Sequence, residues 1–589
     1  MKKNILIAFL LTLSSVAQAN WSFSGGYMYF DNTVTRWTDS SIMLVIGKSD
    51  WSGIYEMSPA DANGDWWFCA LPASGWSDAQ YMAVIGGGSV WKKGAWGPDN
   101  LTNATHYTAA YTAGLSSSAG QKFIFTPASA ANGAKLALTY DGDGHNGVTF
   151  GTQAKNNCYT IDATKQTITF IFSTSAKRFN ISRSDLWKVY VYGSITGWKN
   201  SEEAYRLTGY SDDGCFYRTF PLSSLSRIGN SGQPEYLFYV VKNDETTYTA
   251  KSESSWEGGI DSRLLFKNGG GENMVVALPE DDLDEIRDRN VRAQKIDKLS
   301  DFDFTQPGEQ ARIANWRLVP GTNNLYRSYH PYSPSRDYGT EERRLYWVAQ
   351  LATAAGIAGD IALSGNMSGD AGKSYTCGGN QYTITIPAYY QKLIAANNVL
   401  YVGTANGKTP SYNEAIFHSD GETFAQWIKE VVEWVLDDAH PAPYQIHCAL
   451  GSDRTGAFCA TIAALCGATW EEIAADYEAT TNMNVAEYRH RNCIRACLKR
   501  LCGVDPATDA TFNTAVKAHF VNGGFLTEAQ IDALKAKLNG NATATESQND
   551  GAMRTNDDMG AAKLLHDGGF VIQRGGKQYS MIGQLIVTK

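Results

Sequence analysis

The chain has 589 residues and a formal net charge of −9, and it is 43% hydrophobic and 19% charged. At roughly 150 residues per domain, this length predicts about three or four domains. The hydrophobic content excludes wholesale disorder, and the acidic balance argues against a protein that coats nucleic acid. The 56 Gly, 31 Tyr and 16 Trp residues favour β-rich modules with many turns.

The N-terminus has the three parts of a secretory signal peptide. Two lysines follow Met1, an apolar run extends from Ile5 to Val16, and Ala17-Gln18-Ala19 supplies small residues for a peptidase. We therefore expect residues 1–19 to be removed and the mature protein to be exported. The apolar run has about 12 residues, short of the ~20 needed to cross a bilayer, so no transmembrane segment is predicted.

Two all-β modules are predicted before residue 279. Residues 20–180 contain short segments rich in β-branched and aromatic residues, separated by clusters of Gly, Asn, Asp and Ser, which is typical of a β-sandwich. Residues 185–278 open with a strand-like segment that ends in Gly193-Ser194 and is followed by Gly197-Trp198. This opening resembles those of starch-binding and related carbohydrate-associated β-sandwiches, and the resemblance implies a glycan ligand.

Trp66 and Trp67 are the best candidates for a glycan-binding surface. Adjacent residues of a strand point to opposite faces, so only one of the two can face the core of a simple sandwich. The other could stack its exposed indole on a sugar ring. The alternative is that the tryptophans of these modules fill their cores.

The remaining boundaries follow from changes in composition. Residues 279–301 are strongly charged and predict a linker or a short surface helix. From 302–540, helical periodicity alternates with short apolar strands, which favours an α/β domain. Residues 541–560 have the composition of a linker. Residues 561–589 contain two alternating segments around Gly575-Gly576, which predict a small C-terminal hairpin. This stretch resembles short C-terminal tags of exported bacterial proteins, some of which direct surface sorting.

One segment of the α/β domain carries a chemical motif. His447-Cys448 is followed by five residues and then by Arg454-Thr455-Gly456, which gives the pattern H-C-x5-R-T-G. A predicted strand precedes the motif and a predicted helix follows it, so the loop can curl with its backbone N–H groups inward at the helix N-terminus. We expect this loop to bind a phosphoryl group. The residues expected to surround the phosphate are Ala449, Leu450, Gly451, Ser452, Asp453 and Arg454.

Each side chain of the motif has an expected role. The positive field of the helix terminus and of Arg454 should lower the pKa of Cys448 and give a thiolate nucleophile. The planar Arg454 guanidinium can hold two phosphate oxygens, which a lysine cannot. Thr455 can donate its hydroxyl to the sulfur, while His447 and Gly456 support the loop. This chemistry needs no cofactor, and the cysteines lack the paired spacing of a zinc site, so no metal is predicted.

The motif resembles the phosphate-binding loop of cysteine-dependent protein tyrosine phosphatases. It is most similar to a secreted bacterial branch of tyrosine, dual-specificity and lipid phosphatases, whose loop is typically H-C-x-x-G-K-D-R-T-G. The chain departs from this pattern at Ser452, where the branch usually has a lysine that has been linked to lipid phosphates. Upstream, Asn315-Trp316-Arg317, Leu325-Tyr326-Arg327-Ser328 and Asp360 follow the order of the branch's other elements. The resemblance covers about residues 302–540, with an insertion near 368–412.

A phosphatase of this kind also needs an acid that protonates the leaving oxygen. The resemblance implies Asp453, inside the loop, or Asp360, at the end of an upstream element. A third possibility is a carboxylate outside these two elements, such as Asp420. The alternatives are structural, because Asp453 can bond backbone N–H groups and Asp360 can cap a strand end.

Three hypotheses describe the function. The first is an exported bacterial phosphatase (periplasmic, cell-surface or extracellular) that forms a phosphocysteine intermediate, with phosphotyrosine on a protein or a small phosphate ester as substrate. The second keeps this chemistry and takes inositol phosphates or phosphoinositides. The third is a surface glycan-binding protein whose phosphatase domain is secondary or inactive. An arsenate reductase also uses a Cys-x5-Arg loop, but the Arg-Thr-Gly ending fits it poorly.

Overall fold

A computed structural model describes most of the chain after residue 26. The described residues are 27–39, 42–47, 53–59, 64–70, 81–87, 105–109, 122–141, 148–173, 186–211, 215–242, 247–250, 261–269, 271–336, 338–540, 562–566, 569–574, 577–579 and 585–588. The predicted signal peptide and the predicted linker over 541–560 lie outside them. The chain forms two compact units. The first holds residues 1–224, 236–264 and 278–280, and the second holds residues 225–235, 265–277 and 281–589.

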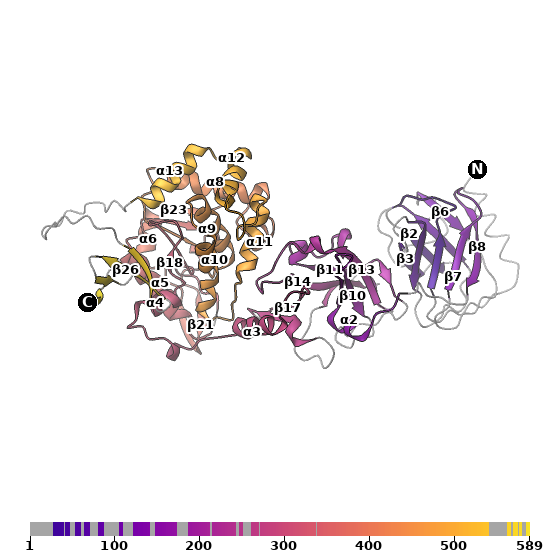
Figure 1. Ribbon diagram of the computed structural model, residues 1–589, viewed down its shortest axis with the longest axis horizontal. Helices are drawn as coiled ribbons and strands as arrows, with labels where there is room; N and C mark the ends of the chain where they lie inside the picture. Colours follow the sequence, from indigo (N-terminus) through magenta and orange to yellow (C-terminus); the bar gives the residue numbers. More distant parts are fainter. Residues whose placement is uncertain are drawn as a thin grey trace. The chain divides into compact units, whose positions relative to one another are not determined.

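The first unit begins with a closed sheet (Figure 1). Its strands are β1 (Tyr27–Asp31), β2 (Ile42–Gly47), β3 (Gly53–Pro59), β4 (Trp66–Ala70), β5 (Tyr81–Gly86), β6 (His106–Ala109), β7 (Lys122–Pro127) and β8 (Ala134–Asp141). The strand order is β1-β4-β3-β2-β5-β6-β8-β7, and β1 pairs with both β4 and β7, which closes the sheet into a barrel. The predicted sandwich is therefore wrong for this module. Sandwiches and barrels share the same alternating strand pattern, so the sequence could not separate them.

The tryptophan pair lies on β4. Trp67 is buried, with 8% of its surface exposed, and its Nε1 donates a hydrogen bond of 3.1 Å to the Gly64 carbonyl. Trp66 is half-buried. The strand thus places one indole inside and its neighbour toward the surface, as the alternation predicted.

The first unit also contains strands of two further sheets. Their elements are α2 (Thr152–Asn157), β9 (Tyr159–Asp162), β10 (Thr167–Ser173), β11 (Leu186–Gly193), β12 (Gly209–Tyr210), β13 (Cys215–Pro221), β14 (Glu235–Lys242) and β15 (Thr247–Ala250). One sheet has the order β12-β13-β10-β9, and in the other β14 pairs with β11 and β15. The sheets pack through aromatic rings, with centroids 4.9 Å apart for Phe170 and Tyr236 and 5.2 Å apart for Phe172 and Phe238. Strand β10 lies within residues 20–180, which were predicted to form the first module. It pairs with β13, however, and so belongs to the following module.

The second unit is the α/β part of the chain. It contains β16 (Leu265–Asn268), β17 (Gly271–Val275), α3 (Leu283–Ala293), α4 (Pro307–Ile313), β18 (Arg317–Leu318), β19 (Leu325–Ser328), α5 (Glu341–Ala354), β20 (Gly359–Ala362), β21 (Ser374–Cys377), β22 (Asn380–Thr383), α6 (Ala388–Ala395), β23 (Val399–Tyr401), α7 (Tyr412–Phe417), α8 (Glu422–Leu436), β24 (Tyr444–His447), α9 (Asp453–Leu465), α10 (Trp470–Ala479), α11 (Arg491–Cys502), α12 (Phe512–Asn522) and α13 (Glu528–Asn539). Within the charged segment 279–301, α3 (Leu283–Ala293) is capped by Asp282 and buries Ile286 and Ala293, so of the two predicted alternatives the short surface helix is the one found.

The central sheet has the order β18-β19-β24-β20-β23, with β19, β24, β20 and β23 parallel. On one face, Tyr444 Oη donates to the Val435 carbonyl of α8. On the other face, Tyr390 of α6 donates to Asp360. Strand β24 lies in the middle of the sheet, and its carboxyl end opens into the turn before α9, which is where ligands bind in open α/β sheets.

Helix α9 is the core of the helical layer. Every residue from Thr455 to Leu465 is buried, and α7, α10, α11 and α12 pack around the helix (Figure 1). A helix that is covered on all sides is typical of a domain centre. The N-terminus of α9, and with it the loop after β24, is therefore held in a fixed place.

The chain ends in a four-stranded antiparallel sheet of β25 (Ala562–His566), β26 (Gly569–Arg574), β27 (Lys577–Tyr579) and β28 (Leu585–Thr588). Strands β26 and β27 flank the predicted turn at Gly575-Gly576, whose two residues lie outside the described ones. Among the helices that the structure describes, none combines the length and apolarity needed to cross a membrane.

Candidate active site

The predicted loop occupies residues 447–453 between β24 and α9. Cys448 is only 3% exposed. Gly451 adopts a left-handed conformation with φ of 72°, and a Cβ there would lie 2.1 Å from the Ser328 carbonyl oxygen. Glycine is required at this position for both reasons. The loop therefore packs its outer side directly against the end of β19.

Three consecutive carbonyls of the loop are held from outside. The His330 backbone N–H donates to the Ala449 carbonyl over 3.2 Å. Asn315 Nδ2 donates to the Leu450 carbonyl over 3.1 Å, and Arg327 Nη2 donates to the Gly451 carbonyl over 2.6 Å. With its carbonyls turned outward, the loop directs its N–H groups toward the centre around Cys448. This arrangement is a nest for an anion, reinforced by the N-terminus of α9.

Arg327 is in turn fixed by a buried carboxylate. It forms an ion pair with Asp476 of α10, and Arg317 Nε contacts the same carboxylate over 2.7 Å. Arg327 is completely buried, and a buried guanidinium needs such pairing to offset its desolvation. The two upstream segments singled out in the sequence thus act as an outer frame for the loop.

The electrostatics of the loop favour a thiolate at Cys448. Burial alone would raise the pKa of this thiol. The Arg454 guanidinium and hydrogen bonding from the Thr455 hydroxyl and backbone N–H outweigh burial, so the pKa lies below its usual value. Within the described residues the Thr455 hydroxyl has no oxygen or nitrogen partner, which leaves it for the sulfur. Thr455 is buried at the start of α9, so its position is fixed.

The neighbouring cysteines behave in the opposite way. Burial raises the pKa of Cys459, Cys466 and Cys497 to about 12 in each case. These thiols stay protonated at any physiological pH, so Cys448 is distinguished from them by its surroundings. Among the described residues, no three His, Cys, Asp or Glu side chains gather in a way that could hold a metal ion.

Arg454 lies at the mouth of the loop, where two segments fix its orientation. Its Nη1 donates to the Leu363 carbonyl over 3.1 Å and to the Pro410 carbonyl over 3.4 Å. Leu363 follows β20, and Pro410 precedes α7. These contacts involve only Nη1, so the remaining N–H groups of the guanidinium can bind phosphate oxygens.

Asp360 lies beneath the loop rather than at its mouth. It is fully buried, accepts a hydrogen bond of 2.9 Å from Tyr390 Oη and lies 3.1 Å from His447 Nε2. His447 Nδ1 lies 3.2 Å from the Cys448 carbonyl. Burial would lower the pKa of His447, but Asp360 outweighs it and raises that pKa. His447 therefore donates on both sides and ties the loop to the sheet, and Asp360 supports His447 instead of reaching a substrate.

Asp453 is the carboxylate that the loop itself presents. Its Oδ2 accepts a hydrogen bond of 2.5 Å from Arg489 Nη2, while its Oδ1 is buried and has no partner among the described residues. Burial raises the pKa of Asp453, Glu487 adds to the rise, and Arg489 opposes it without cancelling it. Asp420 is exposed between α7 and α8, and its charge acts on Cys497 and His519 rather than on Cys448.

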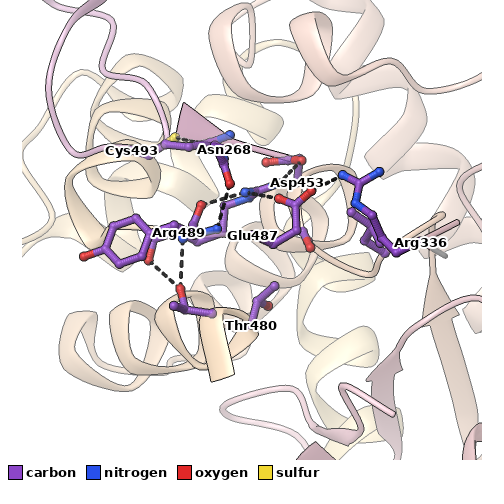
Figure 2. Close-up of polar contacts among 12 residues, drawn as sticks. Asn268, Arg336, Asp453, Thr480, Glu487, Arg489 and Cys493 are labelled. Carbon is purple, nitrogen blue, oxygen red and sulfur yellow. Dashed lines mark hydrogen bonds and ion pairs between the residues drawn. The ribbon is translucent and has the colours of Figure 1, made fainter. Parts of the chain in front are cut away.

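The residues that hold Asp453 were not foreseen from the sequence. Arg489 lies 36 residues after Asp453 and forms a buried ion pair with Glu487 (Figure 2). Asp476, which holds Arg327, was missed as well. The only local signal is the charged stretch Glu487-Tyr488-Arg489-His490-Arg491, which ordinarily indicates a solvated surface.

Comparison with known proteins agrees with this geometry. Residues 388–539 match the Tyrosine phosphatase family. The comparison with curated proteins gives no significant match. The matched region contains Cys448, Asp453 and Arg454, whereas Asn315 and Arg327 precede it. The chain therefore carries a tyrosine-phosphatase-like domain, which makes it a phosphoric monoester hydrolase of that kind.

Proposed function

We propose that this protein is an exported phosphatase that hydrolyses phosphomonoesters, with phosphotyrosine as its leading substrate, through a phosphocysteine intermediate. The observation that carries the proposal is the lowered pKa of Cys448 at the centre of a loop whose carbonyls point away from it. A thiolate inside an anion nest can attack a phosphorus atom that the same nest holds in place.

In the first step, the Cys448 sulfur attacks phosphorus and forms an S–P bond while the bond from phosphorus to the ester oxygen breaks. The loop N–H groups and Arg454 bind the three other phosphate oxygens, where negative charge accumulates. In the second step, water attacks phosphorus, the S–P bond breaks, and inorganic phosphate leaves. Thr455 can donate its hydroxyl to the departing sulfur.

Asp453 is the proposed general acid. Its raised pKa favours the protonated form, and its unpartnered Oδ1 can give that proton to the leaving oxygen. The resulting carboxylate can then take a proton from the attacking water. Asp360 is not proposed for this role because it is fully buried against His447 and Tyr390.

Replacing Cys448 by Ser tests the nucleophile. We expect Cys448→Ser to abolish turnover of p-nitrophenyl phosphate while vanadate still binds, because the nest does not depend on the sulfur. Cys459→Ser is the matched control, since Cys459 is a buried thiol of α9 whose pKa is raised to about 12. Full activity of Cys448→Ser would overturn the proposal.

A side-by-side assay tests the substrate class. Phosphotyrosyl peptide, phosphoinositide and inositol hexakisphosphate are compared by kcat/KM under one set of conditions. We expect the peptide to be preferred, because Ser452, buried and uncharged, stands where the resembling branch usually has a lysine. A preference for either inositol ester would replace phosphotyrosine with the second hypothesis.

Export is proposed from the N-terminal sequence. Residues 1–19 have the basic start, apolar run and small-residue site of a signal peptide. Expression of the full gene in a bacterium, followed by fractionation and N-terminal sequencing, should yield a mature protein beginning at Asn20 outside the cytoplasm. An uncleaved cytoplasmic product would overturn this part of the proposal.

A further inference from the structure

A chain of buried charges leads away from Asp453. Arg489 Nη2 lies 2.5 Å from Asp453 Oδ2, and Arg489 Nη1 lies 2.7 Å from Glu487 Oε2. Arg336 pairs with the other oxygen of Glu487. Figure 2 shows Arg489 between the two carboxylates and Arg336 on the far side of Glu487. The side chains of Arg489 and Glu487 are 3% and 4% exposed, so the centre of the network is shielded from water, whereas Asp453 and Arg336 at its ends are 20% and 27% exposed.

Such a network is not explained by stability alone. Burying two charges costs about as much as their attraction returns, and apolar residues of similar volume often stabilise a protein as well or better. A buried network that meets the reaction loop at a single carboxylate therefore needs a second reason. Here the point of contact is Asp453, which precedes the phosphate-binding arginine.

The segment that carries Glu487 and Arg489 is held by hydrogen bonds to distant residues. We call residues 484–490 the strap; it runs between α10 and α11 and is extended at its end. Its backbone bonds to residues far upstream, as Tyr488 N–H donates to Asn268 Oδ1 over 3.0 Å and His490 N–H donates to the Asn230 carbonyl over 3.2 Å. A fixed strap gives Arg489 a fixed position relative to α9.

The two oxygens of Asp453 are treated differently. Oδ2 accepts a hydrogen bond from Arg489 Nη2, whereas Oδ1 is buried without a partner among the described residues. A guanidinium on one oxygen sets the plane of the carboxyl group and leaves the other oxygen to carry and deliver the proton. We propose that Arg489 and Glu487 are positioning residues that orient Asp453 and balance its charge during proton transfer. This rests on the proposed role of Asp453 as the general acid.

The remaining groups around Asp453 define what a pH measurement can report. Cys448 and Arg454 lie on the same loop and helix start, and each interacts electrostatically with Asp453. The charge of Asp453 also interacts with three further groups, which are Tyr412 of α7, Tyr477 of α10 and Cys493 of α11. The pKa values of these last three groups are raised, mainly by burial, so they remain neutral near pH 7. The charged neighbours that can move the Asp453 titration are therefore the Cys448 thiolate, Arg454, Arg489 and Glu487.

The two positioning residues should shift the basic limb of the kcat/KM profile in opposite directions. Glu487→Gln removes a negative charge that raises the pKa of Asp453, so the limb should move to lower pH by about 1 unit. Arg489→Met removes a positive charge that lowers this pKa, so the limb should move to higher pH by about 1 unit. A merely structural role would reduce activity without moving the limb in opposite senses.

Leaving-group dependence supplies a second readout. 4-Nitrophenolate departs without much help from an acid, whereas phenolate needs protonation. The loss in Arg489→Met should therefore be larger with phenyl phosphate than with p-nitrophenyl phosphate, by on the order of 10-fold or more, given that general acids contribute about 10²–10⁴-fold. Arg489→Lys should recover part of the loss, since a lysine keeps the charge without the planar fork.

The experiment uses the full chain with Asp453→Asn, Glu487→Gln, Arg489→Met and a control. Arg491→Met is the matched control, because Arg491 pairs with Glu471 and Glu478 outside the strap and should keep the wild-type profile. Circular dichroism checks folding, and the near-isosteric Glu487→Gln carries the test if Arg489→Met does not fold. Suppose that Asp453→Asn loses the basic limb of the kcat/KM profile, whereas Glu487→Gln and Arg489→Met keep that limb at its wild-type pH. The positioning role is then overturned, and the role of Asp453 as the general acid stands. If Asp453→Asn keeps the wild-type limb, the assignment of the acid fails and the positioning role fails with it.

Discussion

Replacing Gly451 by Ala tests whether the shape of the loop, and not only its reactive groups, produces activity. A non-glycine residue at φ of 72° costs about 1–2 kcal/mol. The new Cβ would lie 2.1 Å from the Ser328 carbonyl oxygen and 3.0 Å from Asn315 Nδ2, so the loop must move by about 1 Å to restore normal contacts. This movement would also weaken the bond from Arg327 to the Gly451 carbonyl, which as a charged hydrogen bond contributes about 1.5–3 kcal/mol.

Together these costs amount to roughly 3–5 kcal/mol, concentrated in the loop. A displacement of about 1 Å at a reacting centre can reduce the rate by on the order of 10²-fold, and we expect at least this loss in kcat/KM for p-nitrophenyl phosphate. Vanadate affinity, measured by calorimetry, should fall in parallel because the nest itself is distorted.

Gly503→Ala is the control for backbone strain. Gly503 also has a positive φ, 79°, but a Cβ there would have no atom within 4 Å. This variant should lose about 1 kcal/mol of unfolding free energy and keep full activity. If Gly451→Ala retained wild-type kcat/KM and vanadate affinity, the packing of the loop against Ser328 could not be a condition for catalysis.

Three further predictions concern the thiolate and its support. Iodoacetamide at pH 6–7 should alkylate Cys448 in preference to Cys459, because the pKa of Cys448 is lowered whereas that of Cys459 is about 12; peptide mapping by mass spectrometry checks this, and equal labelling would contradict it. Asp360→Asn removes the partner that raises the pKa of His447, so His447 is protonated less readily beneath the loop and the acidic limb of kcat/KM should move to higher pH by about 1 unit. An unmoved limb would show that His447 does not support the thiolate. Hydrogen peroxide should inactivate the enzyme, and thiols should restore it, since a thiolate oxidises first to a reversible sulfenic acid. Undiminished activity after peroxide would argue against Cys448 as nucleophile.

The local part of the site could be predicted from the sequence. His447, Cys448, Arg454 and Thr455 belong to one continuous strand, loop and helix, and the pattern of residue types specifies how such a segment folds. The prediction that Cys448 has a lowered pKa follows from the same local features, and the structure agrees with it. The α/β architecture also follows, because each helix and strand shows its own periodicity.

The parts that could not be predicted depend on distant contacts. Arg489 reaches Asp453 across 36 residues, and its segment has the charged composition of a surface although its side chain is buried. Asp360 illustrates a second limit, since its position at a strand end is compatible with a cap, an acid or a buried support. Only the pairing of β20 beside β24 brings Asp360 under His447.

The extent of the functional unit exceeds the region that matches the family. The match begins at residue 388, yet two of the three loop carbonyls that are held from outside are bound by the side chains of Asn315 and Arg327. The strap is bound by Asn268, which also precedes the matched region. A fragment limited to the match would contain Cys448 and Arg454 but would lack the groups that turn the carbonyls outward. Since the N–H groups can converge on a phosphate only when those carbonyls face away, the upstream segments belong to the proposed phosphate-binding site together with Cys448.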